Sequence, residues 1–472
     1  MNGQVPTAKC QMLSQDQAQS IFEKIRRYST ADEVEILIAG GRSALTRFAN
    51  NTIHQNVAEE NYVVSVRTVF DGRTARATTN RFDDDSLRRT VQAAESLSRV
   101  QQKDPDLLPA PDASAFGDGP AVSRHFPATA AITPEDRAAG VEKIVDVAKK
   151  HSLTTAGIFA TSESVEAVVN SRGLCAYHTQ TGSDISITML APDSSGWQKA
   201  GSPDVSKLDA VSLAETAARK AIESKSPQEL PPGKYTVILE PAAVLDLIGF
   251  MFWDWGGQAI LDERSFLNNR IGTRLFGENI TIDDDAYHPL QSGAPFDGEG
   301  VRRQRVRLVE NGVVQRVVYA RATAEKMRKS DHFAKVGPIA ATGHGLPVPN
   351  EMGEIPLNIV LSGPKGAAPK TVEEMVAGTE RGVLITRLWY IREVDPYEKI
   401  LTGMTRDGTF YIEGGRIRHG IRNFRFNQSL IHMLSNVEEL GEPVRASGEE
   451  SFEMVVPAMK AREFNFTEVT RF

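Results

Sequence analysis

The sequence predicts an α+β protein, with an N-terminal α/β region of mixed sheet and helices followed by a β-rich C-terminal domain. That domain is expected to be an antiparallel sheet or open barrel carrying a few helices. Helical and strand-like patterns alternate over residues 14–224, a proline-rich segment follows at 226–233, and the rest is mostly strand-like. The predicted domains are residues 1–228 and 229–472, and the first divides into 1–103 and 132–228, joined by a connector rich in Pro, Asp and Ala.

The N-terminal region begins with a helix over 14–28, since Ala18, Ile21, Phe22 and Ile25 have helical spacing. Strands are expected at 34–38, 43–50 and 62–70, and Asp71-Gly72 is a two-residue hairpin signal. A second helix begins at Asp83-Asp84-Asp85, because acidic residues in the first turn face the positive end of the helix dipole. Its predicted buried stripe is Leu87, Val91, Ala94, Leu97 and Val100.

Residues 134–224 have a similar order of predicted elements. A helix starts at Thr133-Pro134, with threonine as cap and proline at the first position. Two strands are expected over 154–169, a turn at Asn170-Ser171-Arg172-Gly173, and further strands at 174–180 and 184–190. A helix is expected over 206–224. The sequence shows no residue-level repeat, so a duplicated topology is a hypothesis.

The C-terminal domain is organised around residues 235–312. A short apolar strand over 235–239 is followed by Glu240-Pro241, which opens a helix. This helix is predicted to be buried, because Val244, Leu247, Ile248, Met251, Phe252 and Trp255 follow at helical spacing before Gly256-Gly257. Glu310-Asn311-Gly312-Val313 predicts a hairpin turn, and short helices are expected at 372–378 and 430–437.

Composition excludes several classes of protein. Of 472 residues, 40% are hydrophobic and 24% charged, and the net charge of -7 argues against a nucleic-acid binder. Two cysteines, Cys10 and Cys175, form no disulfide framework or metal knuckle, which favours reduced thiols in a cytoplasm. Residues 1–11 lack the apolar run of a signal peptide, and no stretch is long enough to span a membrane.

Four marks in order carry a resemblance to a known family. They are Asn170-Ser171-x-Gly173, Pro295-Phe296-Asp297-x-Glu299-Gly300-Val301, Thr342-Gly343-His344-Gly345 and the long run 382–440. On these marks the chain resembles the TldD/PmbA family of metallopeptidase-related proteins, also described as modulators of DNA gyrase. The resemblance covers nearly the whole chain.

The resemblance implies a TldE/PmbA-like member without its own metal centre. In TldD-type members a helix at this place carries His-Glu-x-x-x-His, and those motif positions fall on Gly249, Phe250 and Asp254 here. Zinc needs imidazole, thiolate or carboxylate ligands, and the family's late cysteine is also missing. No cofactor is therefore expected in this chain, and zinc is expected only in a TldD-like partner.

The family also implies a function and partners. The expected role is a non-catalytic subunit of a TldD/TldE-like metallopeptidase complex, which binds unfolded peptide and dimerises with a metal-bearing subunit, or with itself, through the C-terminal domain. Two alternatives stay open. One is an active metallopeptidase with a displaced metal site acting as a homodimer, and the other is a regulatory protein-binding module. Neither nucleic acid nor membrane is an expected partner.

Several further polar clusters lie outside these motifs or can be interpreted without them. No two of the nine histidines lie within five residues of each other, which excludes a helical His pair. Asp283-Asp284-Asp285 with His288 is interpreted as a solvated turn or helix cap, and Asp331-His332 as an exposed helix end. Asp297 and Glu299 are possible acid and base residues, although such a pattern more often fixes a turn.

Charged and aromatic residues suggest a peptide cleft. Arg302 and Arg305 lie in a basic run at strand period, which indicates either a solvent-facing edge or a wall for acidic peptide groups. Arg406 and Asp407 are expected at a hairpin near the cleft, and with the two arginines they are the peptide-cleft candidates. Trp253 and Trp255 are expected in the core or in a dimer contact.

Overall fold

The computed structural model describes residues 12–330 and 339–470 and confirms the α+β class. The elements of the N-terminal half are α1 (Gln15–Tyr28), β1 (Glu33–Ala49), β2 (Thr52–Phe70), β3 (Arg73–Thr79), α2 (Asp84–Val100), η1 (Ala113–Ala115), α3 (Pro127–Ala130), α4 (Pro134–Lys150), β4 (Thr154–Asn170), β5 (Cys175–Leu190), β6 (Ser195–Ser202), η2 (Val205–Lys207) and α5 (Ala210–Glu223).

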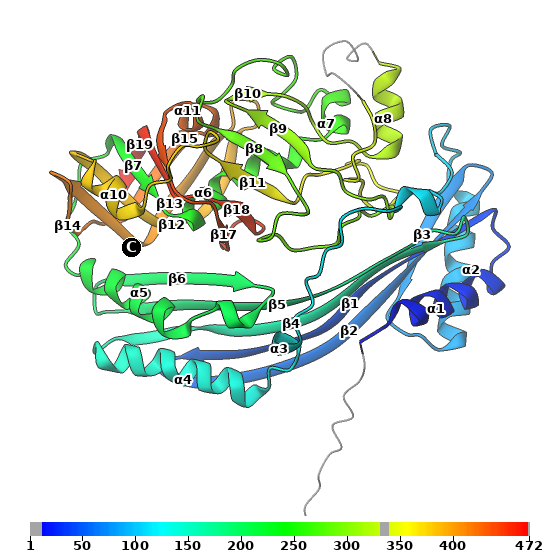
Figure 1. The fold of residues 1–472 in the computed structure, drawn as a ribbon, viewed down its shortest axis with the longest axis horizontal. Coiled ribbons are helices and arrows are strands. Elements are labelled where there is room, and N and C mark those ends of the chain that lie inside the picture. The colour runs from blue at the N-terminus through cyan, green and yellow to red at the C-terminus, as the bar shows by residue number, and fades with distance from the viewer. Residues whose placement is uncertain (1–11, 331–338, 471–472) are drawn as a thin grey trace, which may run out of the picture.

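These strands form one six-stranded antiparallel sheet in the order β3-β2-β1-β4-β5-β6. The order α-β-β-β-α occurs twice, as the duplicated-topology hypothesis expected, and β1 and β4 pair at the centre. Figure 1 shows the sheet as a long curved layer, with the C-terminal domain on one side of it and α4 and α5 on the other. Helices α1 and α2 lie at its far end.

The predicted short strands were wrong in number and length. β1, β4 and β5 each run without interruption where the sequence suggested two pieces, β2 begins at Thr52 and not at residue 62, and β6 was not expected. Gly40 and Gly41 explain the missing break in β1: their φ angles are 138° and 153°, and a Cβ there would lie 2.2 Å from the Asn61 carbonyl oxygen and 1.9 Å from that of Glu163. The glycines therefore allow β1 to continue between two close neighbours.

The predicted stripe of α2 was right in its first half and wrong in its second. Leu87, Val91 and Ala94 are buried, but Leu97 is 45% exposed and Val100 78%. The fully buried Ser98 faces the sheet instead, because its hydroxyl donates to the carbonyl oxygen of Thr68 at 2.9 Å. A polar contact thus sets the orientation of the last helical turns.

The C-terminal half contains more strands than helices. Its elements are β7 (Gly233–Leu239), α6 (Pro241–Ile248), η3 (Gly249–Asp254), α7 (Gly257–Leu261), β8 (Thr281–Asp284), β9 (Val306–Glu310), β10 (Val313–Val314), α8 (Arg321–Arg328), β11 (Ile359–Ser362), α10 (Val372–Ala377), β12 (Arg381–Asp395), β13 (Ile400–Glu413), β14 (Arg416–Gly420), β15 (Phe424–Ser429), α11 (Leu430–Ser435), β16 (Val437–Leu440), β17 (Val444–Ala446), β18 (Met454–Val456) and β19 (Met459–Val469). The hairpin expected at Asn311-Gly312 joins β9 and β10, and both residues have positive φ.

Two sheets make up this half. One has the order β10-β9-β8-β11-β18-β17. In the other, β12, β7, β19, β15 and β13 pair in sequence and β13 pairs again with β12, so the strands close into a barrel. Its aromatic residues Tyr235, Phe424, Phe426, Phe464 and Phe466 form successive ring contacts, of which Phe424 and Phe466 stack at 4.4 Å.

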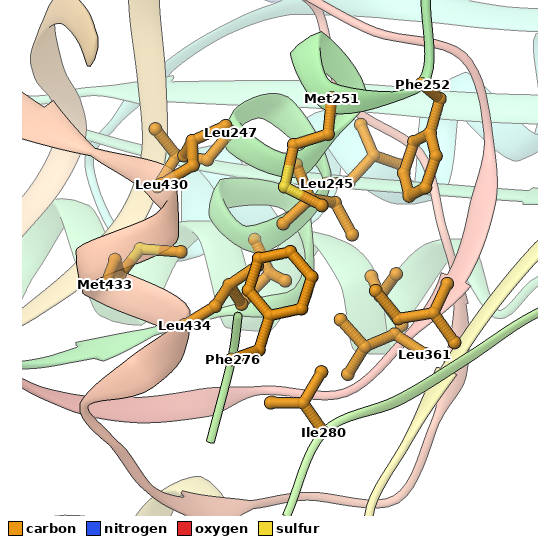
Figure 2. Packing of buried hydrophobic residues seen from close by; sticks show 14 of the residues in the cluster. Leu245, Leu247, Met251, Phe252, Phe276, Ile280, Leu361, Leu430, Met433 and Leu434 are labelled. Atoms are coloured by element: carbon orange, nitrogen blue, oxygen red, sulfur yellow. The ribbon is translucent and has the colours of Figure 1, made fainter. Parts of the chain in front are cut away.

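The largest hydrophobic core surrounds α6 and η3. Figure 2 shows Leu245, Leu247, Met251 and Phe252 of this segment among side chains from other elements, such as Phe276, Leu361 and Leu434. The last six residues of α6, Ala243 to Ile248, are all fully buried. A helix that is apolar on every side requires burial on every side, and here the barrel, the second sheet and α11 provide it.

The division at residue 228 stays a prediction. Cys10 lies outside the described residues, whereas Cys175 is a half-buried free thiol. Among the described residues, no helix is long and apolar enough to cross a membrane.

Replacing Gly41 by alanine should destabilise the N-terminal sheet strongly. The new Cβ meets the backbone oxygen of Glu163 at 1.9 Å, and φ is unfavourable for a side chain. We expect the free energy of unfolding to fall by about 2–4 kcal/mol, seen in calorimetry as a melting temperature lower by about 5–10 °C. Gly182→Ala is the matched control, since its Cβ would meet only the Ser162 hydroxyl. Equal melting of both variants would contradict this account of β1.

Candidate functional site

The positions expected to correspond to the family's metal motif lie in η3, directly after α6. Pro241 occupies the first position of α6, and η3 follows α6 without an intervening loop. Gly249 and Asp254 are buried, and Phe250 is half-buried and packs against the main core. These three residues therefore lie in a helical segment that packs against the main core, and not in a loop.

Gly249 and Phe250 do not fit a zinc ion. A Cβ at Gly249 would lie 1.9 Å from Ser451 Oγ and 2.6 Å from Ser451 Cβ, so the space for an imidazole is already filled. Phe250 offers no ligand atom. Zinc sites need nitrogen, sulfur or oxygen donors at about 2.0–2.3 Å. Within the described ranges, no group of three or more His, Cys, Asp and Glu residues is placed to hold a metal.

Asp254 is part of an ion cluster with a lysine. Lys399 Nζ lies 2.9 Å from Asp254 Oδ2 and 2.8 Å from Glu393 Oε1, and the Lys399 side chain is 2% exposed. Burial raises the pKa of Asp254, and the attraction of Lys399 opposes that rise. The ammonium group thus supplies a fixed positive charge beside η3, and it connects η3 to the hairpin between β12 and β13.

Asp246, one turn before Gly249, is a second buried carboxylate. It accepts hydrogen bonds from the backbone N–H groups of Glu449 and Glu450, at 3.2 and 3.1 Å. Burial raises its pKa to about 7, despite these hydrogen bonds. Two further groups donate to the loop that contains Glu449 and Glu450. Tyr390 N donates to Glu450 Oε1 at 2.8 Å, and Lys199 Nζ donates to the Gly448 carbonyl oxygen at 2.8 Å. Residues 447–453 therefore close over α6 and join it to β12 and β6.

The four peptide-cleft candidates fall into two separate pairs. Arg302 donates to the carbonyl oxygens of Phe116 and Gly117 in the connector, at 2.5 and 2.8 Å. Arg305 forms ion pairs with Asp283 at 3.0 Å and Asp285 at 3.5 Å, and its side chain is 59% exposed. Both arginines precede β9, whereas Arg406 and Asp407 belong to β13 of the barrel.

The hairpin expected at Arg406 and Asp407 was wrong. Both lie within β13, and Asp407 (φ 52°) and Gly408 (φ 123°) form an irregularity opposite Thr386. Asp407 pairs with Arg387 and accepts a hydrogen bond from Ser195 Oγ at 2.6 Å. Because Ser195 belongs to β6, this carboxylate connects the barrel to the N-terminal sheet.

Arginines and tryptophans stack beside Asp407. The Arg387 guanidinium lies 4.8 Å from the ring centre of Trp197 and 5.8 Å from that of Trp389, and Arg406 lies 4.7 Å from Trp389. Such cation–π contacts hold the guanidinium groups over flat aromatic faces. The candidate site thus combines the stack with the Lys399 ion cluster and the loop 447–453, all on or next to β12.

Other predicted polar clusters turn out to be structural. Asp283 and Asp284 are buried in β8, not in a solvated turn, because Asp283 pairs with Arg307 at 2.6 Å and Asp284 with His344 at 2.9 Å. Asp297 accepts backbone hydrogen bonds from Glu299, Val301 and Gly345, and burial raises its pKa and that of Glu299. Asp331 and His332 lie outside the described residues.

Sequence reasoning missed Lys399 and Asp246. Both are ionisable residues whose neighbours in the sequence form no recognisable motif, and their role depends on partners far away in the chain. One indication was available for Asp246: an acid inside a fully apolar helix needs a hydrogen-bonding partner. Trp255 is fully buried, and Trp253 is 54% exposed.

Comparisons with known proteins match the chain along most of its length. Sequence models for domain 1, the central domain and the C-terminal domain of PmbA/TldA metallopeptidases match residues 34–98, 128–225 and 232–468. The metalloprotease PmbA of Escherichia coli O157:H7 is 20% identical over 450 residues, which is 92% of each chain. A metalloprotease of Methanothermobacter thermautotrophicus is 23% identical over 319 residues, 62% of this chain and 65% of that one.

Solved structures share the fold. TldE from Thermococcus kodakarensis superposes with a TM-score of 0.82 at 18% identity, over 96% of this chain and 100% of that one. A candidate modulator of a DNA gyrase from Thermotoga maritima superposes with a TM-score of 0.82 at 19% identity, over 95% and 100%.

Removing the Lys399 ammonium should destabilise the C-terminal domain. Lys399→Met leaves Asp254 buried without a counter-charge, and loss of one partner of a buried ion pair costs about 3–5 kcal/mol. We expect a clear drop in melting temperature by calorimetry, while the exposed control Lys365→Met melts like the original protein. Asp254→Asn in the same chain should restore part of the loss. A Lys399→Met protein with unchanged melting would refute this role.

Asp246 should make stability depend on pH. Its folded pKa of about 7 lies above the ordinary value of 3.8, so the folded state holds a proton that the unfolded state has released between these pH values. Its contribution to stability therefore falls as pH rises from about 4 to 7. The melting temperature of Asp246→Asn, relative to that of the original protein, should rise over this range and then level off. A pH-independent difference between the two proteins would argue against a buried, protonated Asp246.

Proposed function

The chain belongs to the PmbA/TldA metallopeptidase family, and from that premise we propose that it is a non-catalytic TldE/PmbA-type subunit of a TldD/TldE-like complex. In this role it pairs with a metal-bearing TldD-like chain and helps to hold unfolded peptide for cleavage in the cytoplasm. The observation that carries the proposal is the closed arrangement at η3, where Ser451 fills the space beside Gly249, Phe250 has no ligand atom and Lys399 pairs with Asp254.

That arrangement argues against a Lewis-acid centre of its own. Zinc acts by polarising a carbonyl group and by lowering the pKa of a bound water, which requires an open coordination position. Here Ser451 fills the space at Gly249, and Lys399 neutralises Asp254. A second cation placed beside the Lys399 ammonium would meet electrostatic repulsion. We therefore assign proteolytic chemistry to the partner.

An exposed apolar surface next to η3 supports a partner subunit. Trp253 is 54% exposed, and three residues of β12 and its hairpin are also exposed: Tyr390 53%, Val394 61% and Tyr397 48%. Lys399 joins the two segments through its contacts with Asp254 and Glu393. Large aromatic residues exposed together indicate a protein interface. We propose that the TldD-like chain docks on this surface of the C-terminal domain.

The arginine–tryptophan stack is our proposed peptide contact. Arg406 keeps 44% of its side chain exposed while its guanidinium lies over Trp389. It presents hydrogen-bond donors to acidic side chains or to a carboxyl terminus. Asp407 is 7% exposed and engaged by Arg387 and Ser195, so its part is to hold Arg387 rather than to touch the peptide. Arg302 is likewise held by the connector, which leaves Arg305 as the more accessible of that pair.

The partnership can be tested by reconstitution. The purified chain alone should contain no stoichiometric zinc by elemental analysis and should not cleave peptides. Mixed with a TldD-like chain that has an intact His-Glu-x-x-x-His motif, it should form a complex in sedimentation and support cleavage. Trp253→Ala with Tyr397→Ala should weaken that complex, whereas the exposed control Val100→Ala should not. About one tightly held zinc per chain, with activity in isolation, would favour the displaced-site homodimer instead.

Arg406→Ala tests the peptide contact within the complex. We expect a higher KM for acidic peptides, by about tenfold for loss of one charge-assisted contact, while kcat and melting stay close to the original. Arg416→Ala, an exposed arginine of β14, is the matched control. An unchanged KM for acidic peptides would remove Arg406 from the binding surface.

A further inference from the structure

The N-terminal sheet contains an open strand edge. β2 pairs with β1 along almost its whole length, but β3 pairs only with residues Val64 to Phe70 of β2. Residues 52–63 therefore have a neighbour on one side only, among the residues that the structure describes. Nine of these twelve residues are exposed. Every second residue of an antiparallel strand directs its backbone N–H and C=O groups away from its neighbour, toward this open side.

The second half of the internal repeat shows what fits on such an edge. β5 is the equivalent of β2, and β6 pairs only with its residues Ser183 to Leu190. Next to the end of β6, the connector pairs with β5: Thr181 N donates to the Arg124 carbonyl oxygen at 2.9 Å, and Arg124 and Gln180 form a parallel bridge. An extended segment of the same chain thus pairs with part of the equivalent edge.

The covering segment is basic, and the sheet beneath it is acidic. His125 Nε2 lies 2.8 Å from Glu163 Oε1 on β4, one strand inward from the β5 edge. On the open edge, Glu59 and Glu60 are both exposed and lie on opposite faces of β2, since side chains alternate along a strand. Glu60 forms an ion pair with Arg42, with 3.7 Å between Arg42 Nε and Glu60 Oε2. Glu59 has no ion-pair partner within 4.0 Å in the described part of the chain. Carboxylates on both faces favour a strand that carries positive charge.

A hollow beside this edge provides room for side chains. It has a volume of about 380 Å³ and is lined by residues 58–60 of β2, 42–44 of β1 and 161–163 of β4, together with Thr129 and Ala130 of α3. The helix α3 directly follows the segment that covers β5. The hollow therefore runs across the sheet from Glu163 on β4 to the open edge of β2.

From these observations we propose that residues 52–63 of β2 bind an extended peptide with Lys or Arg side chains by strand addition, parallel to β2. Backbone hydrogen bonds to the edge supply affinity without strict sequence choice, and Glu59 and Glu60 supply the preference for basic side chains. The edge lies in the N-terminal sheet, so it is a separate peptide site from the Arg406 surface on the barrel. The proposal rests on the proposed function only for the kind of ligand, an unfolded peptide.

Binding is tested with the full chain and a fluorescein-labelled peptide of alternating Lys and Thr, with an alternating Glu and Thr peptide as comparison. We expect the Lys peptide to bind and to slow amide hydrogen exchange at residues 52–63, and the Glu peptide to do neither. Glu59→Lys with Glu60→Lys should weaken binding of the Lys peptide by about tenfold or more, with unchanged melting, because both sites are exposed. The matched control is Glu142→Lys on the exposed side of α4.

Two proline variants separate the edge from the rest of the sheet. Val57 and Ala58 are neighbours in β2, so one directs its N–H toward β1 and the other toward the open side. Proline at the outward position removes a β2 N–H that only an added strand would use. That variant should therefore melt normally and lose peptide binding. Retained binding in a well-folded proline variant would overturn the proposal.

Further outcomes distinguish the alternatives. Peptide binding without slower exchange at 52–63 would place the peptide elsewhere and refute strand addition here. Slower exchange at 52–63 that grows with protein concentration, without peptide, would assign the edge to a second copy of the chain and also refute it. Failure to pair with a TldD-like chain, with the edge still binding the Lys peptide, would refute only the proposed function.

Discussion

The burial of most of the segment from Ala243 to Asp254 is the constraint on which the C-terminal domain depends. Apart from Asp246, residues Ala243 to Ile248 of α6 are apolar, and all are fully buried, so the barrel, the second sheet and α11 must all pack against them. Burying a side chain such as Leu or Phe contributes roughly 1.5–3 kcal/mol, and this segment contributes many. The same burial makes every polar group in the segment costly unless it has a partner. Asp246 and Asp254 each have one, in the loop 447–453 and in Lys399.

This constraint also accounts for the surroundings of Gly249, Phe250 and Asp254, the positions that we propose correspond to the family's metal motif. Packing of Ser451 against Gly249 removes the space in which a ligand side chain would stand. A lysine between two carboxylates replaces the charge that a metal would bring, but it closes the site instead of leaving a coordination position open. At these positions the chain therefore has a packed and charge-paired core, and the exposed residues beside it form the surface on which we propose that another subunit docks.

Buried charges join the two halves of the molecule in the same way. Lys220 of α5 pairs with Glu240 at 2.6 Å, directly before α6. Glu35 of β1 pairs with Arg67 at 3.2 Å and with Arg76, whose guanidinium also donates to the Val348 carbonyl oxygen of the C-terminal half. Breaking a buried pair costs more than the pair contributes, because an unpaired charge then remains buried. These contacts therefore fix the position of the sheet against the C-terminal domain, and they keep Ser195 of β6 beside Asp407 of β13.

The sequence by itself determined the α+β class, most helix starts, the buried face of α6 and the resemblance to the family, because periodicity, caps and short motifs are local. Proline after Glu240, threonine before Pro134 and Asp83 before α2 each act within a few residues. It did not determine strand continuity at Gly40-Gly41, the closure of the barrel, or the buried position of Asp283 and Asp284, since these depend on neighbouring strands. The partners of Asp254, Asp246 and Asp407 were equally hidden. Only the tertiary structure brings Lys399, the loop 447–453 and Ser195 to them, because an ion pair or hydrogen bond between distant residues leaves no trace in local sequence pattern.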